Sequence, residues 1–361
     1  MTQPYHSPTE IVALEAELLD IPLREPFAIA TGTVTAARNV LVSVRLADGT
    51  VGMGEAAPMP PSGGESQETA LAAIHGMRAL VCGADASAWR PLAAALLSSF
   101  EHQASARAGV EIALLDALTQ SRGTPLWQFL GGSTGQIETD VTIPIESADH
   151  MAELARMHAS QGAKTLKIKV GTTVTDDVDR VLAVIDGAPH CSLILDGNQG
   201  YTTSEALELL ATLALEDVRP ILFEQPVHRH DLEGLAFVTQ HSDVPVAADE
   251  SVHTATDALR IARMGAANVI NIKLMKSGLV EALDIAAVCR AAHIDLMVGA
   301  MIESRLGIAA SAHVVAGLGG FRYIDLDTPM LLARDAFAGG YEQDRMRYLL
   351  GDAPGLGVRR V

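Results

Sequence analysis

The chain has 361 residues, enough for one large α/β barrel or for about two to three smaller domains. Hydrophobic residues make up 48% of it, so a large core can be buried and disorder over most of the length is excluded. The formal net charge of −18 argues against nucleic acid as a partner, because a polyphosphate calls for clustered Lys and Arg. The cysteines, Cys82, Cys191 and Cys289, form no CxxC pair, so neither a disulfide framework nor a zinc site is predicted.

No segment of the sequence is typical of export or of membrane insertion. The first residues, MTQPYHSPTE, lack a basic region followed by an apolar one, so no secretory signal is predicted. The longest apolar stretches, such as residues 91–97, are too short to span a bilayer. We therefore expect a soluble cytoplasmic protein without a membrane partner.

The first third of the chain predicts a small α+β domain. Residues 11–57 alternate apolar and polar side chains, and VLVSVRLADGTVGMGEA is typical of a hairpin that turns at Asp48-Gly49. Residues 65–119 are rich in alanine and helical in pattern. We expect a capping domain over residues 1–135, with the C-terminal tail, residues 335–361, packing back on it.

Residues 136–334 alternate short β-rich runs with amphipathic Ala/Leu-rich stretches, which is typical of βα units around a parallel sheet. Helices are expected at Thr203–Leu215, Leu232–Gln240 and Ala255–Met264, with Gly265 as a C-cap of the last. The predicted fold class is α/β, a modified (β/α) TIM-type barrel preceded by the smaller α+β capping domain. The expected strands are Leu166–Val170, Leu193–Asp196, Ile221–Glu224, Val246–Asp249, Val269–Lys273, Leu296–Gly299 and Tyr323–Asp327.

Nearly every predicted strand ends in a charged residue, and these residues recur at similar intervals. In a (β/α) barrel the carboxyl ends of the strands carry the catalytic groups. Strand ends also meet solvent and are often charged for that reason alone, but a series in register favours a functional interpretation. The series consists of Lys169, Asp196, Glu224, Asp249, Lys273, Glu303 and Asp325.

Three consecutive strands end in the carboxylates Asp196, Glu224 and Asp249. Hard anionic oxygens that converge at a barrel mouth suit an octahedral divalent cation, for which Mg²⁺ is the natural candidate. Zinc is less favoured, because no His or Cys shares these positions. The alternative is that the carboxylates are N-caps of the helices that follow. We predict one Mg²⁺ per subunit.

Lysines stand on either side of these carboxylates in strand order. Lys167 and Lys169 lie two apart, so a strand places both side chains on one face. Lys273 ends a strand beyond the carboxylates. Surface strands also carry lysines for solubility, but in a buried barrel strand a lysine is costly unless it has a partner, which favours a functional role for Lys167 and Lys169.

This arrangement suits one class of reaction, in which a proton α to a carboxylate is removed. The product is an enediolate, which a divalent cation stabilises. The base has to be a neutral amine near pH 7, and a metal ion or a second ammonium such as Lys167 lowers the pKa of a lysine. With Lys169 on one face and Lys273 on the other, removal and return of the proton would invert the stereocentre.

Together the segments TLKIKVG, LILDGNQGY, FEQPV, PVAADES, NVINIKLMKSG and GAMIES resemble the enolase superfamily, muconate-lactonizing subgroup. The resemblance covers nearly the whole chain, including the GMGEAAP loop. It implies an isomerase in which Lys169 and Lys273 are the acid/base residues and Lys167 assists the enolate. The Mg²⁺ ligands that it implies are Asp196, Glu224 and Asp249.

Within that subgroup the chain resembles the dipeptide epimerases, which carry a DxD at the last barrel strand, here Asp325 and Asp327. The resemblance implies that this pair binds the α-ammonium group of an L-Ala-L-Xaa dipeptide, a role that two carboxylates on one face can fill. The alternative is a pair of exposed strand-end aspartates. A homo-oligomer is also implied. The other implied substrate contacts are Thr142, Lys167, Met301 and Glu303, and Asn198 and Glu250 are expected near the metal.

The sequence departs from the glutamate-preferring epimerases in the first N-terminal loop. Those proteins carry an arginine where this chain has Gly32, within ATGTVT. Glycine cannot pair with a glutamate side chain, so an uncharged or hydrophobic second residue is expected instead. The rival activities in the same subgroup are N-acylamino acid racemase, o-succinylbenzoate synthase and cycloisomerase, which only the DxD and the N-terminal loops distinguish.

Overall fold

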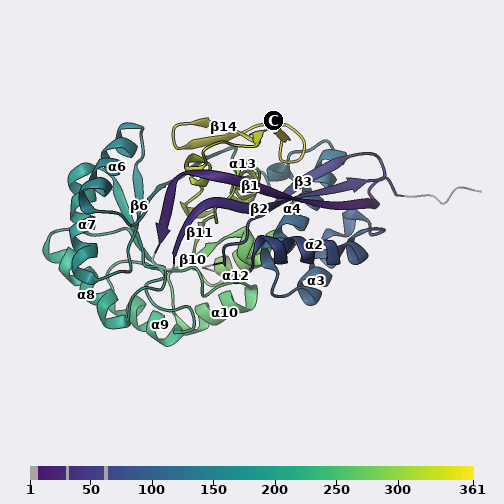
Figure 1. Cartoon of the computed structure of the whole chain (residues 1–361). Coiled ribbons are helices and arrows are strands. Elements are labelled where there is room, and N and C mark those ends of the chain that lie inside the picture. The colour runs from purple at the N-terminus through teal and green to yellow at the C-terminus, as the bar shows by residue number, and fades with distance from the viewer. Residues whose placement is uncertain (1–6, 30–31, 61–63) are drawn as a thin grey trace, which may run out of the picture.

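The amino-terminal part forms a three-stranded antiparallel sheet in the order β1 (Ile11–Ile29), β2 (Gly32–Leu46), β3 (Val51–Ala56). The structure, a computed structural model, describes residues 7–29, 32–60 and 64–361. β2 and β3 turn at the predicted Asp48-Gly49, where the Gly49 N–H donates to Leu46 O at 3.0 Å. β1 and β2 are long and reach from this domain to the barrel (Figure 1), where the Ile145 N–H donates to Ala28 O at 3.2 Å.

Helices pack closely against this sheet, and the glycines of GMGEA allow it. A Cβ at Gly52 would lie 2.2 Å from Ala117 N, and one at Gly54 would lie 2.1 Å from Gly109 O, so only glycine lets the backbones of β3 and α4 (Ala104–Ser121) touch. The helices of this domain are α2 (Gln67–Val81), η1 (Ala86–Ala88), α3 (Trp89–Ser99), α4 (Ala104–Ser121) and α5 (Leu126–Phe129).

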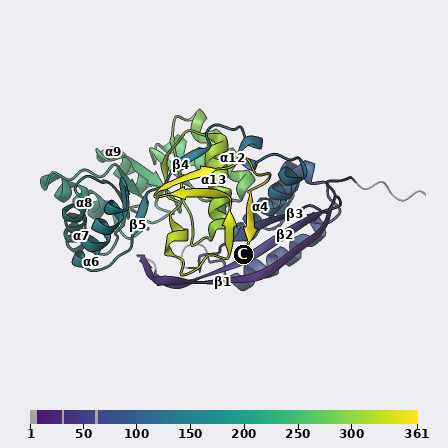
Figure 2. The same ribbon diagram turned by 90° about the horizontal axis from the view of Figure 1, so that it is seen from above.

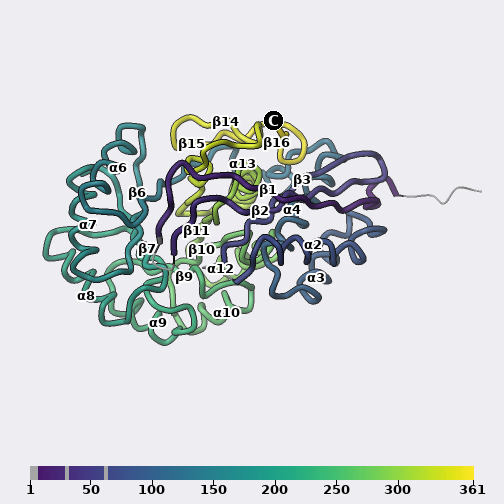
Figure 3. Tube along the Cα trace, viewed as in Figure 1, coloured from purple at the N-terminus to yellow at the C-terminus, as the bar shows by residue number. Residues whose placement is uncertain are grey.

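The second part is an eight-stranded parallel sheet in the order β12-β11-β10-β9-β8-β7-β6-β5, which curls with its helices outside (Figures 1 and 3). Its strands are β5 (Val141–Ile143), β6 (Thr165–Lys169), β7 (Ser192–Asp196), β8 (Leu222–Glu224), β9 (Val246–Ala248), β10 (Val269–Ile272), β11 (Asp295–Val298) and β12 (Phe321–Ile324). Its helices are α6 (Ala148–Ser160), α7 (Val174–Gly187), α8 (Thr203–Leu215), α9 (Leu232–His241), α10 (Ala255–Met264), α11 (Leu274–Ser277), α12 (Leu279–Ala291) and α13 (Arg305–Leu318).

The edge strands of this sheet are β5 and β12, and hydrogen bonds between the residues that flank them close the barrel. The Asp140 N–H donates to Ile324 O at 2.8 Å, and the Leu326 N–H donates to the Thr139 hydroxyl at 2.8 Å. The predicted modified (β/α) barrel with a preceding α+β domain is thereby confirmed.

Local sequence accounts for most of these elements. The helix at Thr203–Leu215 begins with a capping box at Thr202 and Glu205, and Ala255–Met264 ends at Gly265 in the left-handed conformation, as expected. Five of the seven predicted strands run past the observed end. The residues Val170, Asp249, Lys273 and Gly299 each stand one position beyond β6, β9, β10 and β11, and the predicted strand Tyr323–Asp327 runs three residues past β12. The three residues of β5 were missed, since so short a strand shows no periodicity.

The C-terminal tail contacts both parts of the molecule. η2 (Thr328–Leu331) precedes the tail, which contains β13 (Phe337–Gly339), β14 (Tyr341–Asp344), β15 (Arg347–Leu350) and β16 (Val358–Arg360). β15 pairs with β4 (Gln136–Glu138) at the entry to the barrel. The Leu356 N–H donates to Asp116 of α4 at 2.7 Å. Figure 2 shows these strands between the barrel and the amino-terminal domain. Within the described residues, no helix is long and apolar enough to cross a membrane.

Candidate active site at the barrel mouth

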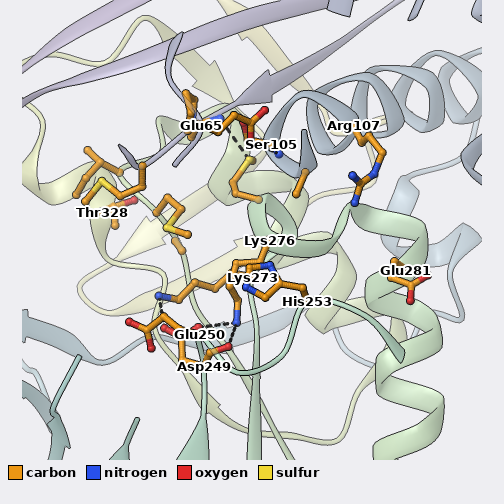
Figure 4. Close-up of a pocket in the computed structure, with 18 of the residues that line it drawn as sticks. Glu65, Ser105, Arg107, Asp249, Glu250, His253, Lys273, Lys276, Glu281 and Thr328 are labelled. Carbon is orange, nitrogen blue, oxygen red and sulfur yellow. Dashed lines mark hydrogen bonds and ion pairs between the residues drawn. The ribbon is translucent and has the colours of Figure 1, made fainter. Parts of the chain in front are cut away.

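A cavity of about 960 Å³ lies between the mouth of the barrel and the capping domain. Its floor carries Lys169, Lys273 and Asp249 from the barrel and Asp325 and Asp327 from the segment after β12. Part of its lining is shown in Figure 4. The carboxyl ends of all eight barrel strands point toward this region, which is where barrel enzymes place their chemistry.

Period-two geometry explains why charged side chains gather here. A small apolar cluster fills the inside of the barrel, formed by Ile194, Leu222, Ala247, Val269, Met297 and Tyr323. Asp196, Glu224, Asp249 and Asp325 each follow a member of that cluster by two residues, so they face the same interior one layer higher. The strands thus carry an apolar plug below and a charged layer above it.

The first lysine pair lies on β6. The Lys169 ammonium contacts Asp196 Oδ2 at 2.6 Å. The Lys167 ammonium is fully buried and contacts Asp196 at 3.0 Å, Glu224 at 2.8 Å and Asp325 at 2.7 Å. Although burial opposes it, these carboxylates raise the pKa of Lys167 well above its usual range. Lys167 therefore remains a cation that links the predicted metal ligands to the DxD segment.

The second group of lysines lies on the opposite side of the barrel. Lys273 contacts Asp249 Oδ2 at 2.8 Å, and Lys276 of α11 contacts Asp249 Oδ1 at 2.6 Å (Figure 4). The Asn271 side chain donates to Glu224 Oε1 at 2.6 Å. Asp249 is consequently held by two ammonium groups, which lower its pKa even though burial acts in the other direction.

The DxD segment forms a third side of the site. Asp327 accepts a hydrogen bond from the Thr142 N–H at 2.6 Å, and Asp325 accepts one from the Thr142 hydroxyl at 3.4 Å. Burial raises the pKa of Asp327 to about 7, and the charge of Asp325 adds to that shift. Both aspartates are buried, so the alternative of exposed strand-end residues is wrong.

Four carboxylates of the site, those of Asp196, Glu224, Asp249 and Glu250, repel one another. Burial raises the pKa of Glu224 to about 7, with Asp196 acting in the same direction. Burial likewise raises the pKa of Glu250 to about 7, with Asp249 and Asp196 adding to it. Glu250 Oε2 and Asn198 Oδ1 are buried without a hydrogen bond. A divalent cation among these oxygens would relieve both the repulsion and the missing contacts, so the donor set fits Mg²⁺.

The side chains as they stand do not form a metal cage. Among the residues that the structure describes, no group of three or more His, Cys, Asp or Glu is arranged to hold an ion. The reason is visible in the contacts above, because ammonium groups lie among the carboxylates and take up their oxygens. The assignment of Asp196, Glu224 and Asp249 as ligands therefore stays a prediction.

Some of the predicted substrate contacts line the cavity, and the others are buried behind its wall. Thr142, Met301, Asp325 and Asp327 line it, as do Lys169, Lys273 and Asn198. Lys167 and Glu303 are fully buried and are not part of its lining. Glu303 instead accepts a hydrogen bond from the Met301 N–H at 2.9 Å, so it supports the cavity wall from behind.

Sequence reasoning missed two groups of residues around the cavity. Asn271 lies two residues before Lys273 and Lys276 three residues after it, in VINIKLMK, and that spacing was the available signal. The apolar wall had no signal, because its residues come from segments that are far apart in the chain. Beside the predicted Met301, it includes Phe27, Ala57, Pro58, Met59, Met275, Ala300, Ile302 and Leu331.

The family of the chain follows from two family models. Residues 13–131 match the mandelate racemase / muconate lactonizing enzyme N-terminal domain, and residues 150–360 match the enolase C-terminal domain-like model. The division between the two models falls close to the predicted boundary between the capping domain and the barrel.

Individual proteins show the same likeness over the whole chain. An aromatic dipeptide epimerase from Herpetosiphon aurantiacus is 48% identical over 97% of this chain and 99% of its own. A solved mandelate racemase/muconate lactonizing protein from that organism has a TM-score of 0.96 at 46% identity, covering 98% and 99% of the two chains. A dipeptide epimerase from Enterococcus faecalis, solved with Mg and L-Leu-L-Tyr, has a TM-score of 0.94 at 35% identity, covering 97% and 100%.

These likenesses confirm the expectations of a dipeptide epimerase and of Mg²⁺ as its cofactor. Oligomeric state is not addressed by them and stays a prediction. With both family models matched and a relative at 48% identity over nearly its full length, the chain belongs to the mandelate racemase / muconate lactonizing enzyme family of the enolase superfamily.

Proposed function

We propose that the protein is a Mg²⁺-dependent epimerase that inverts the α-carbon of the second residue of L-Ala-L-Xaa dipeptides, with an uncharged or hydrophobic Xaa preferred over Glu. The observation that carries this proposal is the placement of Lys169 and Lys273 around one cavity. β6 and β10 are four strands apart in the eight-stranded order, so the two amines approach the cavity from opposite sides. An α-carbon between them can lose a proton to one lysine and regain it from the other.

The remaining charged groups divide the barrel mouth into two arcs. The carboxylates Asp196, Glu224 and Asp249 stand on or just after β7, β8 and β9, between the two lysines. Mg²⁺ held there would bind the substrate carboxylate and stabilise the negative charge of the enediolate. Asp325 and Asp327 lie on the other arc, where a substrate α-ammonium group can pair with them.

The side chain of the second residue would lie against the apolar wall of the cavity. Phe27, Met59, Met301 and Leu331 belong to that wall, which can bury an apolar or aromatic group. Of the described residues that line the cavity, the cations are Lys169, Lys273, Lys276 and Arg107. Arg107 donates to the carbonyl oxygens of Phe100, Glu101 and Ser277 at 2.7 to 3.1 Å, which hold its guanidinium against the backbone.

Asp327→Asn tests the recognition of the α-ammonium group. We expect kcat/KM for L-Ala-L-Phe to fall about 10- to 100-fold, because a hydrogen bond to a charged group contributes about 1.5–3 kcal/mol. The measurement compares L-Ala-L-Phe with N-propionyl-L-Phe, which has the same shape without the ammonium group. The wild type should prefer the dipeptide, and the variant should lose that preference. An unchanged preference in the variant would show that Asp327 does not recognise the ammonium group. A wild type that shows no preference for the dipeptide would instead favour the N-acylamino acid racemase activity.

Gly32→Arg tests the preference for the second residue. Gly32 pairs with Ile29 at the end of the β1–β2 hairpin, close to Phe27 of the cavity wall; residues 30–31 of that loop lie outside the described residues. We expect the ratio of kcat/KM for L-Ala-L-Glu to that for L-Ala-L-Phe to rise about 10-fold, by pairing of the new guanidinium with the glutamate. Gly351→Arg, which adds the same charge on the exposed tail, is the control and should leave the ratio unchanged. No rise in the first variant would contradict the role given to this loop.

A further inference from the structure

We propose that Glu55 of the capping domain is a positioning residue that holds the two walls of the side-chain pocket at a fixed separation and so limits which second residues fit. The inference rests on the proposed dipeptide epimerase function for its substrate. Glu55 lies on β3 and is completely buried, although it carries a carboxyl group and contacts neither the lysines nor the DxD segment.

The carboxyl group of Glu55 is saturated with hydrogen bonds. Its Oε1 accepts from the Asn39 side chain at 2.6 Å and from the Ser304 N–H at 3.0 Å. Its Oε2 accepts from the Ser304 hydroxyl at 2.5 Å and from the Gly307 N–H at 2.9 Å. Asn39 belongs to the capping domain, whereas Ser304 and Gly307 belong to the barrel. One side chain therefore joins the two parts of the molecule.

The barrel partner of Glu55 is the start of a helix. Ser304 is the N-cap of α13, and its hydroxyl also accepts from the Leu306 N–H. A carboxylate is favourable at this end, where backbone N–H groups lack partners within the helix and the helix dipole is positive. A Cβ at Gly307 would lie 2.5 Å from Glu303 Oε2 and 3.2 Å from Glu55 Oε2, so a larger residue there would displace these carboxyl groups.

The contacts of Glu55 lie directly behind both walls of the pocket. On the barrel side, Ala300, Met301 and Ile302 line the cavity just before Ser304. On the capping side, Ala57, Pro58 and Met59 line it just after Glu55. The Asn39 side chain, which donates to Glu55, also donates to Ile302 O at 2.9 Å. The spacing between the walls is thus set by a short network that includes no substrate-contacting side chain.

Glu303 supports the same segment from within the barrel. It accepts from the Met301 N–H at 2.9 Å, while its Oε2 is buried without a hydrogen bond. Burial raises the pKa of Glu303 to about 8, and the nearby Glu55 adds to that shift. The segment from Ala300 to Ser304 is therefore held on both sides by buried carboxyl groups.

Glu55→Gln is the test, because glutamine keeps the shape and places an NH₂ group against donors that need an acceptor. The matched control is Asp116→Asn. Asp116 is an equally buried carboxyl that accepts from the Met53 N–H, on the same strand as Glu55, and from the Leu356 N–H, but it does not line the cavity. Both variants remove hydrogen bonds from a buried carboxyl group, so both should lower the melting temperature.

Kinetics with two substrates separate positioning from general stability. For Glu55→Gln we expect KM for L-Ala-L-Phe to rise about 10-fold with kcat changed by less than about 3-fold, because binding is weakened equally in the ground and transition states. KM for L-Ala-L-Ala, whose methyl group does not reach the capping wall, should change by less than about 3-fold. Asp116→Asn should show neither change. Equal losses for both substrates, or the same pattern in Asp116→Asn, would overturn the proposal.

Hydrogen exchange gives a readout that does not depend on activity. Glu55→Gln should speed amide exchange in residues 300–307 about 10-fold relative to wild type, and Asp116→Asn should not. If Glu55→Gln does not fold, Asn39→Ala is the alternative variant, because it removes the hydrogen bonds to Glu55 and Ile302. It should then show both the faster amide exchange and the higher KM for L-Ala-L-Phe. If the wild type epimerises no dipeptide, the proposed function fails, and unchanged exchange in residues 300–307 would separately overturn the role of Glu55.

Discussion

Replacing Lys169 or Lys273 by alanine is expected to reduce epimerisation by about 10³-fold or more, because each variant lacks one of the two groups that handle the α-proton. The loss should be asymmetric when proton exchange is measured instead. The lysine that remains still faces one epimer, so in D₂O that epimer should exchange its α-proton without inversion. The two variants should label opposite epimers. The measurement is deuterium uptake by mass spectrometry from L-Ala-L-Phe and L-Ala-D-Phe.

Lys164→Ala is the matched control for these variants. Lys164 immediately precedes β6, but its side chain is 66% exposed and pairs with Glu138 at 2.8 Å. An exposed pair of this kind contributes little to stability, so both epimerisation and exchange should match the wild type. If either Lys169→Ala or Lys273→Ala still interconverted the epimers at the wild-type rate, a two-lysine mechanism would be excluded.

Asp249→Asn is expected to abolish Mg²⁺ binding in the micromolar to millimolar range and to lower kcat/KM by about 10³-fold, since a metal ligand and the charge stabilisation of the enediolate are lost together. Asp249 lies next to Lys273 and Lys276, so the variant also leaves two buried ammonium groups without their partner. Calorimetric titration with Mg²⁺ alone measures the first effect without any substrate. Treatment of the wild type with a chelator should reproduce the loss of activity, and added Mg²⁺ should restore it.

The control for this variant lies at the other end of the barrel. Asp295 begins β11, is exposed and pairs with Arg322 at 2.6 Å. Asp295→Asn should bind Mg²⁺ as the wild type does. Normal Mg²⁺ binding by Asp249→Asn would exclude Asp249 as a ligand. Glu250, which lies beside it and has an oxygen without a hydrogen bond, would then be the candidate ligand.

Much of the fold could be predicted from local pattern. The hairpin at Asp48-Gly49, the helices Thr203–Leu215 and Ala255–Met264, and the order of the barrel strands all follow from turn residues, caps and apolar periodicity, which act over a few neighbouring residues. Element ends were less certain, because the last residue of a strand is decided by its pairing with a neighbouring strand.

For the residues of the site, the sequence predicts the positions along the chain, whereas side-chain packing decides the contacts. The strand-end positions of Lys169, Asp196, Glu224, Asp249 and Lys273 are a property of the sequence, because a parallel barrel brings equivalent strand ends to one mouth. Which of them meet the cavity depends on side-chain packing across the barrel. Lys167 could therefore be placed on the correct face from the sequence, but not beneath Lys169 and out of reach of the cavity.

The sequence by itself determined the fold class, the family and the chemical types of residue at the barrel mouth, since each of these depends on periodicity or on short motifs. Only the tertiary structure decided how the capping domain meets the barrel. Phe27 lies on β1, whereas Met59 and Ile302 lie in loops far away in the chain, and the network around Glu55 joins residues about 250 positions apart. Such contacts leave no local pattern, because they arise from the packing of surfaces that the two parts of the chain form separately.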